Sequence, residues 1–387
     1  MRELLSRDFF VDPDIAKAES LPGSTFVDPS FLELELNTIF NRTWMLIPPF
    51  ASSDGSIDLN ELQNKPGSRV PFSLLGRPLF LQTNLKGEIN CFPNVCTHAW
   101  HPLVESASVG GSIVCPQHGR EFDSNGNFVF HKGFEKLQDF PRKSDNLRKL
   151  HVEKWGPFIS VCLGEPFAPF KKIMEDVSES IPGLDVEAFQ YKQVANESRE
   201  VDGNWKQHAW NYMDNYHIRF VHKGPGGLAD AIDLESYTTE LYEHSALQWA
   251  YARHPVHGFA PDQVATRFQD PKHPDKRVFA LWWFIFPNLT LNFYPWGLSV
   301  NQYMPIPGRP DRTQFNWYQL SLDESKFSQR NKLWLNDQVD AEDIEAITLV
   351  SKGARSGFAP RGRFAPKEET GPHWLHRLIY ATLFDDS

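Results

Sequence analysis

The sequence has few cysteines and no long hydrophobic segment, and each shortage argues against a class of protein. Four of the 387 residues are cysteines. Two of them, Cys96 and Cys115, stand at a spacing typical of metal ligands, which fits a reducing cytoplasm better than a disulfide framework. The charged amino terminus has no continuous apolar stretch, and no later run approaches the length of a membrane span. We therefore expect a cytoplasmic protein with neither a secretory signal nor a membrane segment.

Basic charge is also scarce, which bears on the choice of partners. The chain has 39 Lys and Arg against 49 Asp and Glu, a formal net charge of -10. Binding to nucleic acid or to anionic membranes requires a basic surface, so we expect neither, and a small substrate or another protein is favoured as the partner. With 41% hydrophobic residues, the chain can bury a sizeable core, most plausibly in two domains.

The pattern of apolar runs divides the chain into a short lead-in and two domains. Residues 1–45 include a helical pattern over Pro29–Thr43, and we expect this lead-in to pack on the second of the two domains, residues 166–387. Residues 46–165 contain short apolar runs broken by turn residues, which predicts an all-β domain. Prolines and a glycine near residues 164–169 indicate a linker. Residues 166–387 read as α+β, with helices predicted over Asn204–Phe220, Gln329–Lys352 and His373–Leu383, and strands over Phe279–Phe286, Leu289–Phe293 and Gln314–Leu322.

The all-β domain contains two pairs of metal-ligating residues. Cys96 and His98 form the first pair, Cys115 and His118 form the second, and sixteen residues separate His98 from Cys115. A Rieske [2Fe-2S] cluster needs this set, because two cysteines bind one iron and two histidines bind the other. A structural zinc site also accepts two Cys and two His, but zinc fingers usually pair Cys with Cys and His with His. The mixed pairs favour the cluster.

The other two cysteines and a second group of histidines are interpreted differently. Cys91 and Cys162 are expected to be small buried side chains. His217 and His222 are our candidate ligands of a mononuclear iron(II), which two histidines and a distant carboxylate can hold while leaving positions open for dioxygen. Five residues on a regular helix would turn the second histidine away from the first, so we expect the helix to end or to bulge between them.

Three further features of this segment complete the expectation. The glycines and proline at residues 224–227 support a helix that ends. Asp214 lies three residues before His217, so on a helix its carboxylate could accept a hydrogen bond from the second nitrogen of that imidazole. His208 is expected to be structural.

These residues resemble the α subunits of Rieske non-haem iron oxygenases, a family that includes ring-hydroxylating dioxygenases and choline- and carnitine-type monooxygenases. The resemblance covers most of the chain, and the short spacing from Asn211 to His217 looks more like the choline and carnitine type. It rests on Cys96, His98, Cys115 and His118, on Asn204-Trp205-Lys206, and on the segment from Asn211 to His222. The resemblance implies a Rieske domain followed by a helix-grip antiparallel sheet. It also assigns Asp214 the role of bridging to the cluster of a neighbouring subunit, in a homotrimer.

The resemblance also points to the third iron ligand. In the family it comes from a late helix, in an acidic pair that precedes a glycine and a serine. Glu342-Asp343, followed by Gly353 and Ser356, match this arrangement, which assigns the ligand to Asp343. Glu342 and Asp340 stay open as alternatives, because a shift of one residue in register would exchange them.

Several positions depart from the pattern of the family. Ala99-Trp100 stands where Arg-Gly is common, Gln117 where an aromatic residue is common, and Trp210 where an acid often precedes the asparagine. These changes could alter the hydrogen bonds around the cluster or the polarity of the iron pocket. We take Asn211 as a candidate substrate-binding residue.

The prediction is therefore the terminal oxygenase component of a Rieske system. It would use dioxygen to hydroxylate, dioxygenate or oxidatively demethylate a small organic substrate. Electrons would come from NAD(P)H through a separate reductase or ferredoxin and the Rieske cluster. Two alternatives are a Rieske electron carrier or redox sensor with a ligand-binding domain, and a zinc-stabilised binding protein.

Overall fold

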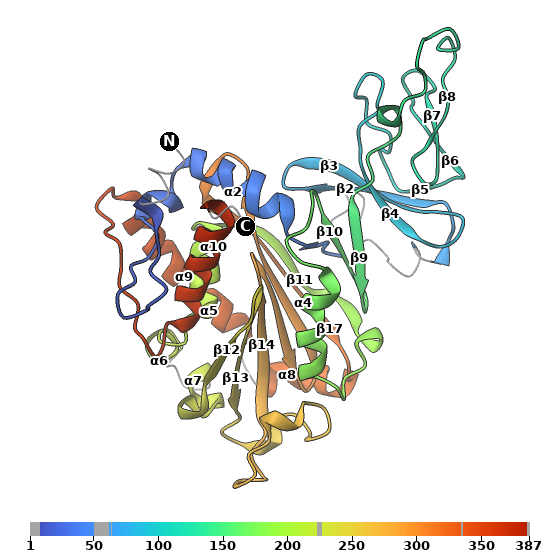
Figure 1. The fold of residues 1–387 in the computed structure, drawn as a ribbon. Coiled ribbons are helices and arrows are strands. Elements are labelled where there is room, and N and C mark those ends of the chain that lie inside the picture. Colours follow the sequence, from blue (N-terminus) through green and yellow to red (C-terminus); the bar gives the residue numbers. More distant parts are fainter. Residues whose placement is uncertain (1–7, 50–61, 63, 223–226, 334–335, 385–387) are drawn as a thin grey trace. The chain divides into compact units, whose positions relative to one another are not determined.

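The structure is a computed structural model that describes residues 8–49, 62, 64–222, 227–333 and 336–384, and it divides into two compact units (Figure 1). One unit is Trp44–Phe167, and the other combines Met1–Thr43 with Ala168–Ser387. We call them the cluster unit and the catalytic unit. Among the described helices, none has both the length and the apolar character needed to cross a membrane.

The cluster unit consists of three small antiparallel sheets. Their strand orders are β1-β10-β9, β4-β3-β2-β5 and β6-β7-β8. The strands are β1 (Met45–Leu46), β2 (Ser68–Leu74), β3 (Arg77–Thr83), β4 (Ile89–Pro93), β5 (Ser108–Val109), β6 (Ser112–Val114), β7 (Glu121–Asp123), β8 (Phe128–Phe130), β9 (His151–Trp155) and β10 (Phe158–Cys162). Leu75 and Gly76 join β2 to β3 with φ values of 53° and 73°, the left-handed conformation that a two-residue type I′ hairpin requires.

The catalytic unit is built on one seven-stranded antiparallel sheet with the order β11-β17-β16-β15-β14-β13-β12. The strands are β11 (Gln190–Asp202), β12 (Thr238–Leu241), β13 (Ser245–Tyr251), β14 (Val278–Ile285), β15 (Leu289–Tyr294), β16 (Gly297–Ile306) and β17 (Arg309–Ser321). Cross-strand pairing places Gln248, Trp282, Asn292 and Ser299 in one row, each opposite the next. Because side chains alternate along a strand, this row lies on one face of the sheet.

Helices pack on both faces of this sheet, and most of the longer ones gather on the face that carries the row. The helices are α2 (Pro29–Arg42), α4 (Phe170–Ser180), α5 (Trp205–Met213), α6 (Ile218–Val221), α7 (Leu228–Ala231), α8 (Glu324–Leu333), α9 (Asn336–Arg355) and α10 (Thr370–Phe384). Figure 1 shows α5, α9 and α10 side by side next to the sheet. Tyr212 of α5 donates a hydrogen bond to Asn292 Oδ1 at 2.7 Å. On the opposite face, Trp283 Nε1 donates to Ser180 Oγ at the end of α4 at 3.0 Å.

The start of α5 explains the Asn-Trp-Lys motif. Asn204 is the N-cap, and its side chain accepts a hydrogen bond from the backbone N–H of Lys206 at 3.0 Å. The Lys206 ammonium donates to Glu35 Oε1 of α2 at 2.6 Å, and Trp205 Nε1 donates to Glu35 Oε2 at 2.9 Å. Lys206 and Glu35 are both fully buried. The motif therefore joins α5 to α2.

The predicted elements agree with the structure except around the histidines. The Pro29–Thr43 helix and the three predicted strands correspond to α2, β14, β15 and β17, and the last predicted helix corresponds to α10. The helix predicted over Gln329–Lys352 corresponds to α8 and α9, on either side of residues 334–335, which lie outside the described residues. The helix predicted over Asn204–Phe220 is wrong in its second half, because α5 ends at Met213.

Candidate metal centres

Two loops of the cluster unit offer one cysteine and one histidine each, and they have the same backbone hydrogen bonds. Trp100 N–H donates to the Cys96 carbonyl at 3.1 Å, and Gly119 N–H donates to the Cys115 carbonyl at 2.9 Å. Trp100 and Gly119 are both left-handed, with φ values of 65° and 71°. Glycine adopts this conformation at little cost, whereas tryptophan is strained in it.

The four candidate cluster ligands differ in burial according to residue type. Cys96 and Cys115 are buried, with 1% and 2% of their surface exposed, among the aromatic and aliphatic side chains of the core. His98 and His118 are exposed, and their ring centroids lie 4.9 Å apart. The thiols and imidazoles thus form an inner and an outer pair, which fits the two-cysteine, two-histidine ligand set.

Residues that the sequence did not single out surround these loops. His131 lies 4.8 Å from the His98 ring and stacks on Phe134 at 3.9 Å between ring centroids. Arg120 is 2% exposed and pairs with Asp145 at 2.5 Å. Burial lowers the pKa of His98, and the charges of His118 and Arg120 lower it further. The position of Arg120 directly after His118-Gly119 was the signal available in the sequence.

The departures from the family pattern lie in two kinds of environment. Ala99, Trp100 and Gln117 are exposed at the ligand loops, and Trp100 has 81% of its surface exposed. Trp210 instead packs inside the catalytic unit, where its ring meets the His376 ring edge-on at 4.5 Å between centroids. Ala99, Trp100 and Gln117 are therefore placed to affect how the ligand loops contact other molecules. Trp210 instead affects how α5 packs against α10.

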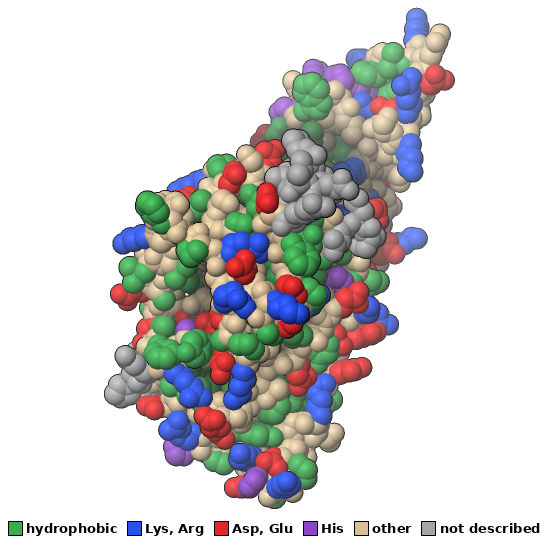
Figure 2. All heavy atoms as spheres, turned by 60° about the vertical axis from the view of Figure 1, so that its left-hand side comes forward, with side chains coloured by type: hydrophobic (Ala, Val, Ile, Leu, Met, Phe, Trp, Pro, Cys, Tyr) green, Lys and Arg blue, Asp and Glu red, His purple; other side chains and the backbone are tan. Residues whose placement is uncertain are grey.

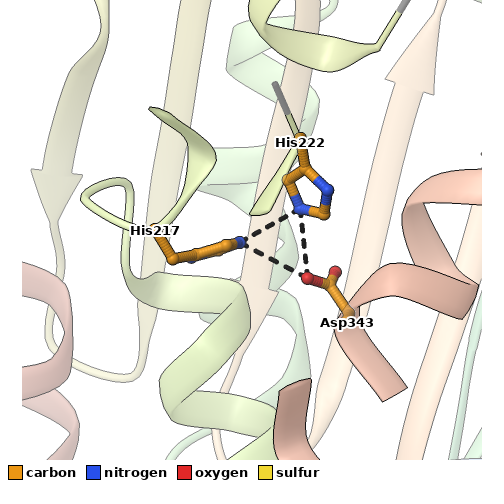
Figure 3. Close-up of side chains that lie close together, drawn as sticks. All are labelled: His217, His222 and Asp343. Carbon is orange, nitrogen blue, oxygen red and sulfur yellow. Dashed lines mark hydrogen bonds and ion pairs between the residues drawn. The ribbon is translucent and has the colours of Figure 1, made fainter. Parts of the chain in front are cut away.

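In the catalytic unit, His217, His222 and Asp343 point toward one another (Figure 3). The two Nε2 atoms are 3.1 Å apart, and Asp343 Oδ1 lies 3.4 Å from His217 Nε2 and 3.1 Å from His222 Nε2. Asp343 Oδ1 is buried, yet no well-directed hydrogen bond reaches it. A point equidistant from the three atoms lies about 1.9 Å from each, close to the ~2.0–2.2 Å at which metal ions bind imidazole and carboxylate. The three side chains therefore fit a metal ion.

Local backbone chemistry places the two histidines. Asp214 has an extended backbone and ends α5, and its Oδ1 accepts a hydrogen bond from the Tyr216 N–H at 2.6 Å. Such a side-chain bond to the backbone competes with helix continuation. His217 then precedes the single turn of α6 and His222 follows it. The helix thus ends before the first histidine rather than between the two, and residues 223–226 lie outside the described residues.

Carboxylates also contact the outer nitrogens of both histidines. Glu342 Oε2 lies 2.7 Å from His222 Nδ1, and Asp214 Oδ2 lies 3.5 Å from His217 Nδ1. Of the open alternatives, Asp343 faces both Nε2 atoms, and Glu342 lies behind His222. Such carboxylates fix the tautomer and the orientation of an imidazole ligand. Glu342 was considered only as a rival of Asp343, and its contact with His222 was not foreseen.

The electrostatics of this group reflect opposite charges held close together. Burial lowers the pKa of His217, but the close negative charges of Asp214 and Asp343 outweigh it and raise the pKa to about 10. The pKa of His222 is raised in the same way, against its burial, chiefly by Asp343. Burial raises the pKa of Asp343, and the two histidines outweigh it and hold the pKa well below its usual value. Without a metal ion the site therefore pairs an ionised carboxylate with protonated histidines, whose protons a bound metal ion would displace.

A cavity adjoins the three residues, and we call it the substrate cavity. It contains about 690 Å³ of space including its mouth. Its lining includes Asn211, Asp340 and the sheet row Gln248, Trp282, Asn292 and Ser299. The cavity thus lies between the iron-site helices and the sheet, and Asn211 is placed where a substrate-binding residue is expected.

The remaining predictions concern residues that were not expected to bind metal. Cys91 and Cys162 are fully buried, as expected. His208 is buried, its Nε2 lies 3.0 Å from the Asp202 carbonyl, and burial lowers its pKa to about 4, which fits a structural role. In the last helix, His376 is fully buried.

Comparison with known proteins identifies the family. Residues 188–383 match the ring hydroxylating alpha subunit (catalytic domain) family, and residues 57–141 match the Rieske [2Fe-2S] domain. The chain therefore belongs to the ring-hydroxylating α subunits.

Individual relatives cover nearly the whole chain. Choline monooxygenase, chloroplastic, of Arabidopsis thaliana is 25% identical over 386 residues, which span 96% of this chain and 85% of that protein. The carnitine monooxygenase oxygenase subunit of Escherichia coli (strain K12) is 22% identical and covers 99% of this chain and 98% of its own length.

Solved structures share the fold. A quaternary ammonium Rieske monooxygenase superposes with a TM-score of 0.73 at 18% identity, over 96% of this chain and 99% of that chain. Naphthalene 1,2-dioxygenase superposes with a TM-score of 0.68 at 18% identity, over 95% of this chain and 92% of that chain. The predicted order of a Rieske domain followed by an antiparallel-sheet catalytic domain is confirmed.

The class of activity follows from the family. The chain is a Rieske non-haem iron oxygenase α subunit, an oxidoreductase with a Rieske [2Fe-2S] cluster and a mononuclear iron as its cofactors. The predicted enzyme class and cofactors are confirmed. The alternatives of a simple electron carrier and of a zinc-stabilised binding protein are set aside, because the catalytic domain is present.

Proposed function

We propose that this chain is a terminal oxygenase whose mononuclear iron is held by His217, His222 and Asp343. The convergence of two Nε2 atoms and one carboxylate oxygen next to the substrate cavity supports this assignment. Two histidines and one carboxylate are the ligand set of non-haem iron oxygenases. Such an iron, when bound, supplies dioxygen activation, leading to hydroxylation, dioxygenation or oxidative demethylation of the substrate.

We further propose that Cys96, His98, Cys115 and His118 hold the Rieske cluster within a domain spanning residues 46–165. Residues 166–387, with the lead-in 1–45, would form the catalytic domain. Buried thiols and exposed imidazoles support this placement, because exposed histidines give an electron donor access to the cluster. The proposed donor is a reductase or ferredoxin supplied by NAD(P)H, and the proposed compartment is the cytoplasm.

In this proposal the side chains around the iron site position their neighbours and hold protons. Glu342 accepts the Nδ1 proton of His222 and so presents its Nε2 toward Asp343. The Asp214 carboxylate lies farther from His217 Nδ1, at 3.5 Å, and acts on that ring through its charge. Asp214 would also face the cluster domain of a second copy in a homotrimer, since a structural neighbour is described with inter-subunit electron transfer.

Charge on the surface agrees with a small substrate rather than a nucleic acid. On the face seen in Figure 2, basic and acidic side chains are interspersed and do not form one basic patch. The net charge of -10 points the same way.

The test is a metal analysis of His217→Ala, with His273→Ala as a matched control because His273 is exposed. We expect His217→Ala to lose the mononuclear iron and keep the cluster signal in electron paramagnetic resonance, with His273→Ala unchanged. Full mononuclear iron in His217→Ala would contradict the assignment. Asp214→Asn should keep both metals and severely reduce coupled turnover, and normal turnover would contradict the role of Asp214.

A further inference from the structure

The substrate cavity has a chemical character that narrows the class of substrate. No lysine or arginine is found among the described residues that line it, whereas Asp340 lies at its wall beside the iron-site carboxylates. The charge of Asp340 adds to burial in raising the pKa of Tyr294 and of Tyr303. Outside the proposed iron site, a carboxylate substrate would find no cationic side chain on this lining, so this part of the cavity favours a cation or a neutral molecule.

Aromatic side chains form much of the wall. Tyr237 stacks on Trp282 with ring centroids 5.7 Å apart, and the Trp282 Nε1 donates to the Tyr294 hydroxyl at 3.1 Å. All three line the cavity. Faces of tryptophan and tyrosine attract cations, including ammonium groups. Together with Asp340, these rings favour a cation over a neutral molecule.

Two buried acceptors add a requirement that a cation alone does not meet. Gln248 and Asn301 line the cavity with 1% and 6% of their surface exposed. The Gln248 amide nitrogen donates to the Tyr212 carbonyl at 2.9 Å, but Gln248 Oε1 accepts no hydrogen bond from the described chain. Asn301 Oδ1 accepts none either. Buried acceptors normally have donors, so these two oxygens are suited to N–H groups of a ligand.

We propose that the substrate cavity binds a protonated amine that still carries N–H hydrogens, which donate to Gln248 Oε1 and Asn301 Oδ1. The inference rests on the proposed function, because it takes this cavity as the substrate site. A quaternary ammonium ion would be attracted by the rings and by the charge of Asp340 but would leave both acceptors without donors. The amine class thus separates this chain from relatives named for choline and carnitine, which are quaternary ammonium compounds.

The test compares ligands that differ only in the N–H bond. Holoenzyme is titrated calorimetrically at pH 7 under argon with N,N-dimethylbenzylamine and benzyltrimethylammonium, and with N,N-dimethylethanolamine and choline. Benzyl alcohol and benzoate serve as neutral and anionic counterparts. We expect the N–H ammonium to bind at least tenfold more tightly than its permethylated partner in at least one series, and benzoate to show no binding.

Variants test the atoms involved. Gln248→Leu removes the acceptor and should abolish the preference for the N–H ammonium while leaving the affinity for the permethylated ion unchanged. Both Gln248→Leu and Gln248→Glu lose the hydrogen bond that the amide nitrogen donates to the Tyr212 carbonyl. Gln248→Glu keeps an acceptor oxygen, so it should retain the preference for the N–H ammonium. A preference that survives Gln248→Leu would overturn the role of this residue.

The wild-type comparison remains decisive if the variants fail to fold. Equal or tighter binding of the permethylated ions, tighter binding of benzyl alcohol or benzoate, or no ammonium binding in either series would overturn the proposal. Binding under argon does not require turnover. Absence of oxygen consumption with a reductase present, together with the expected ranking, would therefore contradict the proposed function and not the amine class.

Discussion

The buried ion pair between Glu35 and Lys206 offers a direct test of how α2 and α5 are held together. Glu35 accepts hydrogen bonds from the Lys206 ammonium at 2.6 Å and from Trp205 Nε1 at 2.9 Å. Burial raises the pKa of Glu35 and lowers that of Lys206, and the attraction between the two charges opposes both shifts. Removing one partner therefore leaves the other in an environment that disfavours its charge.

The magnitudes follow from what each substitution leaves unpaired. Loss of one partner of a buried ion pair costs about 3–5 kcal/mol of unfolding free energy. Glu35→Leu leaves two donors without an acceptor, so we expect the upper end of that range, about 5 kcal/mol. Lys206→Met leaves Trp205 bonded to Glu35, so we expect the lower end, about 3 kcal/mol. The double variant should cost much less than the sum, since apolar replacement of a whole pair is often close to neutral.

The measurement is a double-mutant cycle on urea unfolding, followed by tryptophan fluorescence and by far-ultraviolet circular dichroism. A matched control is Lys17→Met, since Lys17 pairs with Asp14 at an exposed position and this substitution should leave stability nearly unchanged. The reasoning would be refuted by additive costs in the double variant, or by a cost below about 1 kcal/mol for Glu35→Leu. Reversal of the order of the two single variants would refute the argument from the Trp205 hydrogen bond.

Three other outcomes are expected. Leu21 N–H donates to His376 Nδ1, and burial lowers the pKa of His376 to about 3. The free energy of unfolding should therefore fall as pH drops below about 6.5, by about 2 kcal/mol at pH 5. His376→Gln should remove this pH dependence, as measured by acid unfolding. Trp100→Gly should raise stability by about 1 kcal/mol because it relieves a left-handed backbone, whereas Gly119→Ala should lower it, both measured by thermal unfolding. The pKa of His217 is raised to about 10, so protonated His217 stabilises the metal-free protein fully below about pH 6.5, and this stabilisation is lost as pH rises toward 10. Iron(II) binding near pH 7 should therefore release protons, which calorimetry in buffers of different ionisation enthalpy measures.

Much of the fold was predictable because its signals are local. Strands β14 and β15 are long apolar runs separated by a turn, and α2 begins with Asp28 as N-cap and a proline at its first position. The ends of α5 were harder to place. Asp214 terminates that helix through a hydrogen bond to the Tyr216 backbone, and the apolar periodicity of the sequence carries no signal for this.

The residues around the candidate sites show a similar division. The types and spacings of the candidate ligands could be identified from the sequence, and the structure brings His217, His222 and Asp343 together. The acceptors Gln248 and Asn301 lie on separate strands, and only the register of the sheet places them on the same cavity wall. Long-range pairing of this kind leaves no trace in local composition.

The uncertainty between Glu342 and Asp343 has a physical explanation in the helix that carries them. Successive residues on α9 are turned by about 100°, so adjacent side chains reach different sides of a neighbouring group. Here the neighbouring group is the His222 ring, with Glu342 at Nδ1 and Asp343 at Nε2. Both acids therefore act on one histidine from opposite nitrogens. The sequence match treated Glu342 and Asp343 as alternatives for one ligand position, whereas on the helix they act together on the same ring. Neither acid can take the place of the other unless the His222 ring moves.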